Sequence, residues 1–279
     1  MRIGVLGQGR LGYGLASSLH AQGHDIFSWS RDSKEQAWTN QAVDKFGKFN
    51  HSPLDKFIIA SGSSNPRSIT SLEELARTAD YLSLISQDFV GQIYYLSSGA
   101  VYGNCRIPMR EVDICQPSTV YGESKFSAEE KLRSILGNDL TIFRIGNIVP
   151  EKLDFGIFRM VKENLSSDTP IKLMGDSRDS RDYLGEKELI SILSSLIVSN
   201  HQLDLLNIGS GESLSLQEIV DILKNIYSNE LNVTWAPRSE FDVSNTYLDV
   251  SRLKSLIEIP TTNSKSLIEN LFSSLIEVR

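Results

Sequence analysis

Cysteine is scarce in this sequence and long apolar segments are missing, and each shortage excludes a class of protein. Only two of the 279 residues are cysteines, Cys105 and Cys115, which excludes the disulfide framework of a small secreted domain. Residues 189–198 form the most apolar stretch of the later chain, but serines interrupt it and it is too short to span a bilayer. Residues 1–10 lack the pattern of a secretory signal. These shortages predict free thiols and a cytoplasmic protein.

No block rich in lysine and arginine is present either. The chain has 28 Lys and Arg against 35 Asp and Glu, which gives a formal net charge of −7. Neither nucleic acid nor an anionic membrane is therefore an expected partner. The four histidines are His20, His24, His51 and His201. Their positions lack the spacing of metal ligands, so no metal site is expected.

The sequence does contain a regular alternation of apolar runs and helical patterns. Strands are expected at residues 2–6, 25–29, 57–60, 92–96, 140–145 and 205–208. Helices are expected at residues 11–22, 71–83, 124–136, 186–198 and 216–227. This order predicts an α/β fold with a doubly wound parallel sheet, the Rossmann arrangement, and a smaller C-terminal lobe.

Two domains are expected from the same order. Residues 1–148 would form a dinucleotide-binding Rossmann domain. Residues 149–279, where strands are sparser, would form mainly a substrate-binding lobe, with some segments returning to the sheet. Residues 32–55 are compact for a second crossover, and no strand is assigned there. The paired carboxylates Glu73-Glu74 and Glu129-Glu130 are interpreted as helix-surface charge.

A glycine motif connects the first expected strand to the first expected helix. It reads Gly7-Gln8-Gly9-Arg10-Leu11-Gly12. Glycine serves where the chain turns tightly, where backbone approaches a pyrophosphate, and where helix packs on strand. The amides at the helix N-terminus then face the phosphates. The motif predicts a dinucleotide site formed by Gly7, Gly9, Arg10, Leu11 and Gly12, with Ala60 at the end of the strand 57–60.

The end of the second strand indicates which dinucleotide is bound. An acidic residue there would hold the ribose hydroxyls of NAD, but this chain has Ser30 and Arg31. A serine can hydrogen-bond a 2′-phosphate, and an arginine can form a forked ion pair with it. The two residues therefore favour NADP(H) as the cofactor. NAD(H) stays an alternative, because Asp32 follows at once.

Three residues have the chemistry of a hydride-transfer site. Tyr121 and Lys125 are four residues apart, so on a helix they share a face. An ammonium group beside a phenol stabilises the phenolate and brings its pKa toward neutrality. Ser98, at a strand end, can orient the carbonyl or hydroxyl of a substrate. A Tyr–Lys pair at this spacing also occurs by chance on helix surfaces; here it follows a glycine motif and a serine-ended strand in the expected order.

Six stretches in order carry a resemblance to a known family. They are LSSGAVYG at 96–103, Glu111 to YGESK at 121–125, RIGNIVP at 144–150, RDY at 181–183, NIGSGE at 207–212 and LDVSRL at 248–253. The chain resembles an extended short-chain dehydrogenase/reductase of the NAD-dependent epimerase/dehydratase family, whose members act on nucleotide sugars. One departure is the shorter glycine motif, since the family usually has GxxGxxG.

The resemblance implies roles for several residues. It implies Ser98, Tyr121 and Lys125 as the catalytic set, with Tyr121 and Lys125 also touching the cofactor. It implies Asn147 as a contact to the sugar or its phosphate, and Arg181 and Arg238 as guanidinium forks on the substrate diphosphate. From the residues alone, each arginine could instead form a surface salt bridge, and for Arg238 the salt bridge is the favoured interpretation. A homodimer through the helix that carries Tyr121 and Lys125 is also implied.

The residues after Ser98 restrict the reaction. Family members that eliminate water carry an Asp-Glu pair there, whereas this chain has Gly99 and Ala100, which do not ionise. Dehydration is therefore not expected. The lead hypothesis is NADPH-dependent reduction of a nucleotide-linked 4-keto sugar. An epimerase that retains NAD is the alternative, and a non-catalytic NADP-binding sensor is the second alternative, although such proteins tend to lose the tyrosine or lysine.

Overall fold

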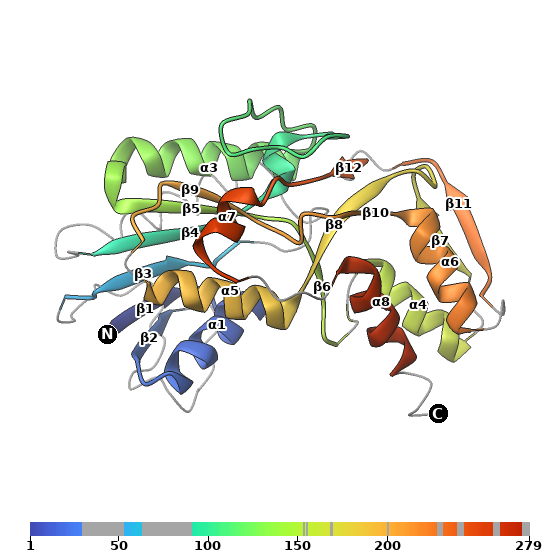
Figure 1. The fold of residues 1–279 in the computed structure, drawn as a ribbon, viewed down its shortest axis with the longest axis horizontal. Coiled ribbons are helices and arrows are strands. Elements are labelled where there is room, and N and C mark those ends of the chain that lie inside the picture. Colours follow the sequence, from blue (N-terminus) through green and yellow to red (C-terminus); the bar gives the residue numbers. More distant parts are fainter. Residues whose placement is uncertain are drawn as a thin grey trace.

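A six-stranded parallel sheet forms the centre of the protein (Figure 1). In this computed structural model the described residues are 1–29, 53–62, 91–152, 154, 156–167, 170–199, 201–227, 231–238, 243–258 and 263–274. The strands are β1 (Arg2–Leu6), β2 (Asp25–Trp29), β3 (Lys56–Ile59), β4 (Gln92–Ser98), β5 (Leu140–Ile145) and β9 (Leu205–Ile208). Their order is β2-β1-β3-β4-β5-β9, with every neighbouring pair parallel. The expected doubly wound parallel sheet is confirmed.

Helices cover both faces of this sheet. On one face, α1 (Arg10–Ala21) packs beside α5 (Glu186–Val198), and on the other lies α3 (Val120–Leu136) (Figure 1). The apolar side chains between the helices and the sheet form two clusters. One contains Leu15 and Leu189, and the other contains Ala128 and Leu132. Both faces of the sheet are thus buried, which is why its strands read as continuous apolar runs in the sequence.

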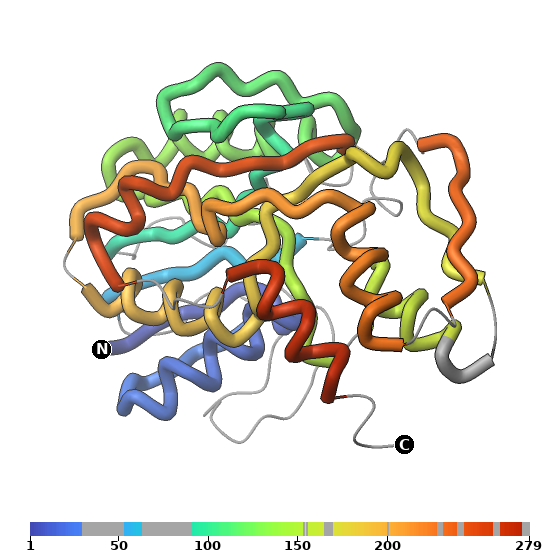
Figure 2. The backbone as a smooth tube through the Cα atoms, turned by 45° about the vertical axis from the view of Figure 1, so that its right-hand side comes forward, coloured from blue at the N-terminus to red at the C-terminus, as the bar shows by residue number. Residues whose placement is uncertain are grey.

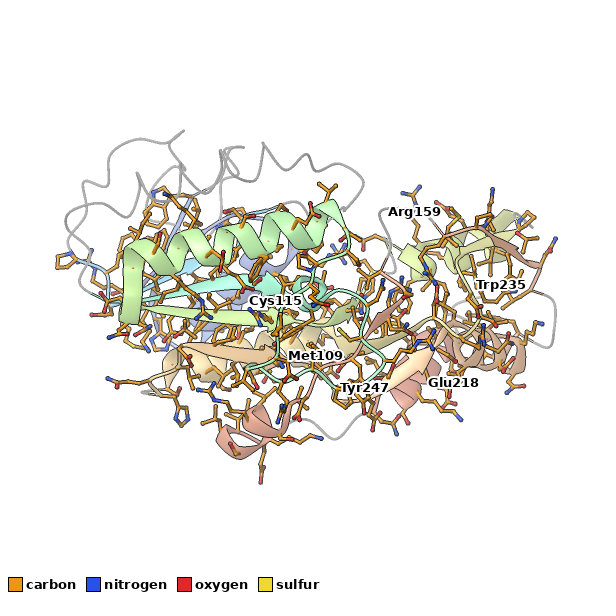
Figure 3. The ribbon with its side chains drawn as sticks, turned by 90° about the horizontal axis from the view of Figure 1, so that it is seen from above. Met109, Cys115, Arg159, Glu218, Trp235 and Tyr247 are labelled. Carbon is orange, nitrogen blue, oxygen red and sulfur yellow. The ribbon has the colours of Figure 1, made fainter. Side chains whose placement is uncertain are left out.

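The later chain forms a smaller lobe around a third apolar cluster. Its helices are α4 (Gly156–Ser167), α6 (Leu216–Ile226) and α8 (Ser264–Ser273). Its strands are β6 (Asn147–Val149), β7 (Ile171–Met174), β8 (Ser180–Gly185), β10 (Ser213–Ser215), β11 (Val233–Ala236) and β12 (Asn245–Thr246). Figure 2 shows this lobe beside the large sheet, and Figure 3 labels Arg159, Glu218 and Trp235 on it. The expected C-terminal lobe is confirmed.

The boundary of the two parts is less simple than the sequence suggests. The expected division between residues 148 and 149 falls inside β6, which pairs in parallel with β8. β9 and α7 (Ser251–Leu256) return to the large sheet, where they contact each other. A later segment of the chain also holds the loop after β4, because Met109 N donates a hydrogen bond to Tyr247 O at 2.9 Å. Met109 and Tyr247 lie side by side in Figure 3. The two-domain division stays a prediction.

Most expected elements of the described chain occur where they were placed. β1, β2, β5, β9 and α5 have the expected bounds, whereas β4 continues to Ser98 and α3 begins at Val120. The helix starts earlier because Thr119 caps it, its hydroxyl accepting a hydrogen bond from Gly122 N at 3.1 Å. The short strands β6, β7, β8, β10, β11 and β12 were not expected. The helix predicted at 71–83 lies outside the described residues.

Candidate active site

A cleft of about 450 Å³ opens at the carboxyl ends of the central strands. The strand order reverses between β1 and β3, which is where open α/β sheets bind their ligands. The volume is within the range of small-molecule sites. The lining includes the predicted residues Gly9, Arg10, Leu11, Ala60, Ser98, Tyr121, Lys125, Asn147 and Arg181. The cleft thus brings together most of the predicted site residues that the structure describes, while Gly7, Gly12 and Arg238 are not part of its lining.

The glycine motif contributes Gly9, Arg10 and Leu11 to the wall of the cleft. Gly7 has a φ of +101°, a conformation that favours glycine, and a Cβ on Gly12 would overlap the Gly7 carbonyl oxygen. Gly9 has open space where a Cβ would stand, and it precedes α1 without a side-chain cap. An uncapped helix N-terminus beside an open glycine fits a diphosphate group. These residues therefore fit a dinucleotide; Ser30 and Arg31, which would choose between its forms, lie outside the described residues.

The side chain of Arg10 connects the glycine motif to the later chain. Its Nη2 donates to Asp154 Oδ1 at 2.6 Å, and its Nε lies 4.0 Å from Glu186 Oε2 at the start of α5. Burial raises the pKa of Glu186, and the charge of Arg10 opposes that rise. Arg10 thus lines the cleft while holding the loop before α4 against α1 and α5.

The three predicted catalytic residues come from two elements that meet at the cleft. Ser98 ends β4, and its Oγ accepts a hydrogen bond from Ala100 N at 3.2 Å. Tyr121 is half-buried in the first turn of α3, and Lys125 lies one turn later. Lys125 is buried, with Nζ 3.4 Å from Leu96 O. A serine, a tyrosine and a lysine therefore face one cavity.

The part of the cleft that the later chain lines combines the cation Arg181 with an apolar wall. Arg181 lines it from β8 and donates from Nη2 to Val243 O at 2.9 Å. Asn147 donates from Nδ2 to Thr246 Oγ1 at 2.6 Å. The apolar wall consists of Ile157, Phe158, Met160, Leu173, Met174 and Leu216. This part of the cleft can therefore hold an anionic group next to an apolar or planar one.

Arg238 lies elsewhere, in a second cavity of about 350 Å³. Its Nη2 and Nε donate to the two carboxylate oxygens of Asp179 at 2.5 and 3.2 Å. Ser180 lines this second cavity and Arg181 the first, as expected for successive residues that point to opposite sides of a strand. The structure thus does not bring Arg181 and Arg238 together on one diphosphate.

Two buried carboxylates were missed by sequence reasoning. Asp182 is fully buried and accepts hydrogen bonds from Ser210 N and Gly211 N at 2.7 and 2.9 Å. The interpretation of Glu129-Glu130 as surface charge is wrong for Glu129, which is 1% exposed and pairs with Arg144. A signal for it was present: Glu129 lies four residues after Lys125, on the same helix face.

The cysteines, the possible metal ligands and the helix lengths of the described residues bear on the expectations from the sequence. Cys105 is buried and Cys115 half-buried, and both are free thiols. Within the described ranges, no group of three or more His, Cys, Asp or Glu side chains is placed to hold a metal ion. No helix of the same ranges has the length and apolar character to cross a membrane.

The sequence identifies the family to which this protein belongs. Residues 3–209 match the NAD dependent epimerase/dehydratase family, and the chain is a member of it. Its relatives include dTDP-4-dehydro-6-deoxyglucose reductase of Escherichia coli, 29% identical over 66% of this chain and 60% of the relative. A putative UDP-glucose 4-epimerase of Methanocaldococcus jannaschii is 26% identical over 70% of this chain and 66% of that protein. The chain thus spans somewhat less than two thirds of these relatives.

Solved structures agree on the fold. UDP-glucuronic acid 4-epimerase from Bacillus cereus, in complex with UDP-glucuronic acid and NAD, has a TM-score of 0.83 at 17% identity. The match covers 100% of this chain and 99% of the epimerase chain. UDP-glucose 4-epimerase from Thermus thermophilus, in complex with NAD, has a TM-score of 0.79 at 18% identity, with 98% of both chains covered. At such identities the likeness establishes the Rossmann-type fold of the chain.

Proposed function

We propose that this protein reduces the carbonyl of a nucleotide-linked keto sugar, of the 4-keto type, with a nicotinamide dinucleotide. The bound dinucleotide supplies the hydride. Tyr121 delivers the proton from its Oη to the carbonyl oxygen, and Ser98 Oγ hydrogen-bonds that oxygen and orients it. Lys125 stabilises the phenolate left on Tyr121 and holds the cofactor ribose. A single observation carries the proposal: Ser98, Tyr121 and Lys125 line the same cleft as the glycine motif.

The residues around Ser98 favour reduction over elimination. Gly99 and Ala100 follow it in a buried 3-10 turn, and neither side chain can act as acid or base. Removal of water from a sugar needs both. Arg181, at the far end of the cleft, is the residue proposed to bind the diphosphate, and Asn147 the sugar or its phosphate.

The cofactor is proposed to be NADP(H), because Ser30 and Arg31 replace the acidic residue that would hold the ribose of NAD. Parallel titration of NADPH and NADH into the wild type and Arg31→Ala tests this. A preference for NADPH that Arg31→Ala abolishes supports the assignment. Equal or tighter binding of NADH by the wild type contradicts it.

Epimerisation is the second candidate function. It is favoured by the epimerase name of the Methanocaldococcus jannaschii relative. An epimerase returns the hydride to its substrate and keeps the cofactor bound, whereas a reductase consumes NADPH in proportion to product. Stoichiometric oxidation of added NADPH therefore supports reduction, and turnover without added cofactor supports epimerisation.

The decisive experiment is an assay of the purified protein with a panel of nucleotide-linked 4-keto sugars. Tyr121→Phe removes the proton donor and should abolish turnover while cofactor binding persists. Tyr13→Phe, which changes an exposed tyrosine of α1, serves as the matched control and should retain wild-type activity. Cofactor binding without turnover of any sugar would instead support the sensor. The proposed homodimer through α3 is tested separately by the mass of the protein in solution.

A further inference from the structure

A buried ion pair lies directly behind the candidate catalytic residues. Glu129 is on α3, one turn beyond Lys125. Its carboxylate accepts hydrogen bonds from Nε and Nη2 of Arg144, a residue of β5, at 3.1 and 2.7 Å. The Ser97 hydroxyl donates to the same carboxylate at 2.5 Å. The side chains of Arg144 and Glu129 are only 5% and 1% exposed.

Stability alone is a poor explanation for such a pair. Two charges lose their hydration when they are buried, and well-packed apolar side chains of similar volume usually serve folding as well or better. A buried pair with fork geometry can instead fix the relative position of the elements that carry it.

The carboxylate of Glu129 links the two elements that carry the proposed catalytic residues, and Arg144 holds that carboxylate from β5. α3 carries Tyr121 and Lys125, and Ser97 precedes Ser98 on β4. Ser97 is also the register partner of Arg144 on β5. The carboxylate of Glu129 thus contacts β4 at Ser97, the residue before Ser98. It also contacts Arg144 on the neighbouring strand β5. A further polar tie from α3 to β4, the hydrogen bond from Lys125 to Leu96 O, is long at 3.4 Å.

The same arginine also holds the chain that follows Ser98. Its guanidinium carbon lies 4.7 Å from the ring centroid of Tyr102, in the 3-10 turn Gly99–Tyr102. Tyr102 Oη in turn donates to Asn207 Oδ1 of β9 at 2.8 Å. The segment with Ser98 is therefore fixed at both ends by groups that converge on Arg144.

We propose that Glu129 and Arg144 are positioning residues that set the distance between Ser98 and the Tyr121–Lys125 pair. This inference rests on the proposed function for its kinetic readout. Proton delivery and carbonyl orientation require Ser98 and Tyr121 to meet one oxygen atom at hydrogen-bond distance. A small shift of α3 against β4 breaks that condition without closing the cleft or moving Arg181.

The test separates positioning from folding with a paired substitution. Single changes such as Glu129→Gln or Arg144→Met leave a buried partner without its counterpart and can prevent folding. The double variant Glu129→Leu/Arg144→Met removes both charges and keeps the bulk of both side chains. We expect it to unfold near the wild-type midpoint but to lose about ten- to a hundredfold in kcat, with little change in KM.

The matched control carries the same kind of substitution on an exposed ion pair of α8, away from α3. Lys265 and Glu269 form that pair, and Glu269→Leu/Lys265→Met should leave kcat unchanged. Arg144→Lys keeps the charge without the fork, so an intermediate kcat is expected. A folded Glu129→Leu/Arg144→Met variant with wild-type kcat would overturn the inference.

A second readout does not depend on turnover. Amide hydrogen exchange of residues 121–125, at the start of α3, should be faster in Glu129→Leu/Arg144→Met than in the wild type or the control. If the wild type reduces none of the sugars, the proposed function fails, and this exchange decides the positioning role alone. Unchanged exchange at equal global stability overturns that role.

Discussion

The carboxylate of Asp182 accepts hydrogen bonds from both the backbone amide and the hydroxyl of Ser210, at 2.7 and 2.8 Å. These bonds tie β8, which carries Arg181, to the loop after β9. Asp182 is 0% exposed, and burial raises its pKa to about 6 although the hydrogen bonds oppose the rise. An ionisable group at a strand that lines the cleft makes the stability of this region depend on pH.

The first prediction concerns that dependence. The pKa of Asp182 is higher in the folded than in the unfolded chain, so its contribution to stability is complete below pH 3.8 and is lost as pH rises through about 6. A rise of this size corresponds to about 3 kcal/mol at most. Relative to wild type, Asp182→Asn should therefore become less destabilising from pH 4 to pH 7, as measured by urea unfolding.

Asp176 provides the control of opposite sign. It is on the surface, where the Arg178 guanidinium holds the pKa of its carboxyl below the ordinary value. Its contribution is present at neutral pH and lost on acidification. Asp176→Asn should thus become less destabilising as pH falls. A pH-independent difference between Asp182→Asn and wild type would contradict the first prediction.

The second prediction concerns the cap of α3. Thr119→Ala removes the hydroxyl that accepts from Gly122 N, so we expect a loss of about 1 kcal/mol in the free energy of unfolding. Thr119→Ser keeps the acceptor and should lose much less. Equilibrium denaturation of both variants measures the difference. Equal loss in the two would mean that the threonine methyl, and not the cap, is what matters.

The third prediction separates two glycines of one motif. Gly12→Ala places a methyl group against the Gly7 carbonyl oxygen, so it should lower stability by about 1–3 kcal/mol. Gly9→Ala meets no atom within 4 Å and should fold normally, but its methyl group enters the cleft at the proposed diphosphate position. We expect it to weaken dinucleotide binding by about tenfold, measured by calorimetric titration. Normal binding by Gly9→Ala would place the diphosphate elsewhere.

Sequence reasoning succeeded where one local pattern fixes the outcome. Strands such as β1 and β5 are buried on both faces, so their apolar runs predicted their bounds. The glycine motif and the Tyr121–Lys125 spacing likewise led to residues of the cleft. Each of these signals lies within a few consecutive residues.

It failed where the outcome depends on contacts between distant segments. β8 contains both Arg181 and Asp182, and the pairing of β8 with β6, β10 and β12 turns one to the cleft and buries the other. Arg238 pairs with Asp179, 59 residues away, which no local pattern shows. The burial of Glu129 depends on Arg144, which extends from β5 toward α3 and pairs with the Glu129 carboxylate. Charged residues at such positions look like surface residues in the sequence.

The last prediction follows from the separation of the two arginines. Arg181 lines the cleft, so Arg181→Ala should raise KM for a nucleotide sugar by about tenfold or more through loss of the proposed charge-assisted contact to the diphosphate. Arg238→Ala removes a partner of Asp179 in the second cavity, so it should lower stability and leave KM nearly unchanged. Steady-state kinetics with the same sugar compares the two variants. A comparable rise of KM in Arg238→Ala would contradict this separation, because it would mean that Arg238 leaves Asp179 and joins Arg181 on the diphosphate once substrate is bound.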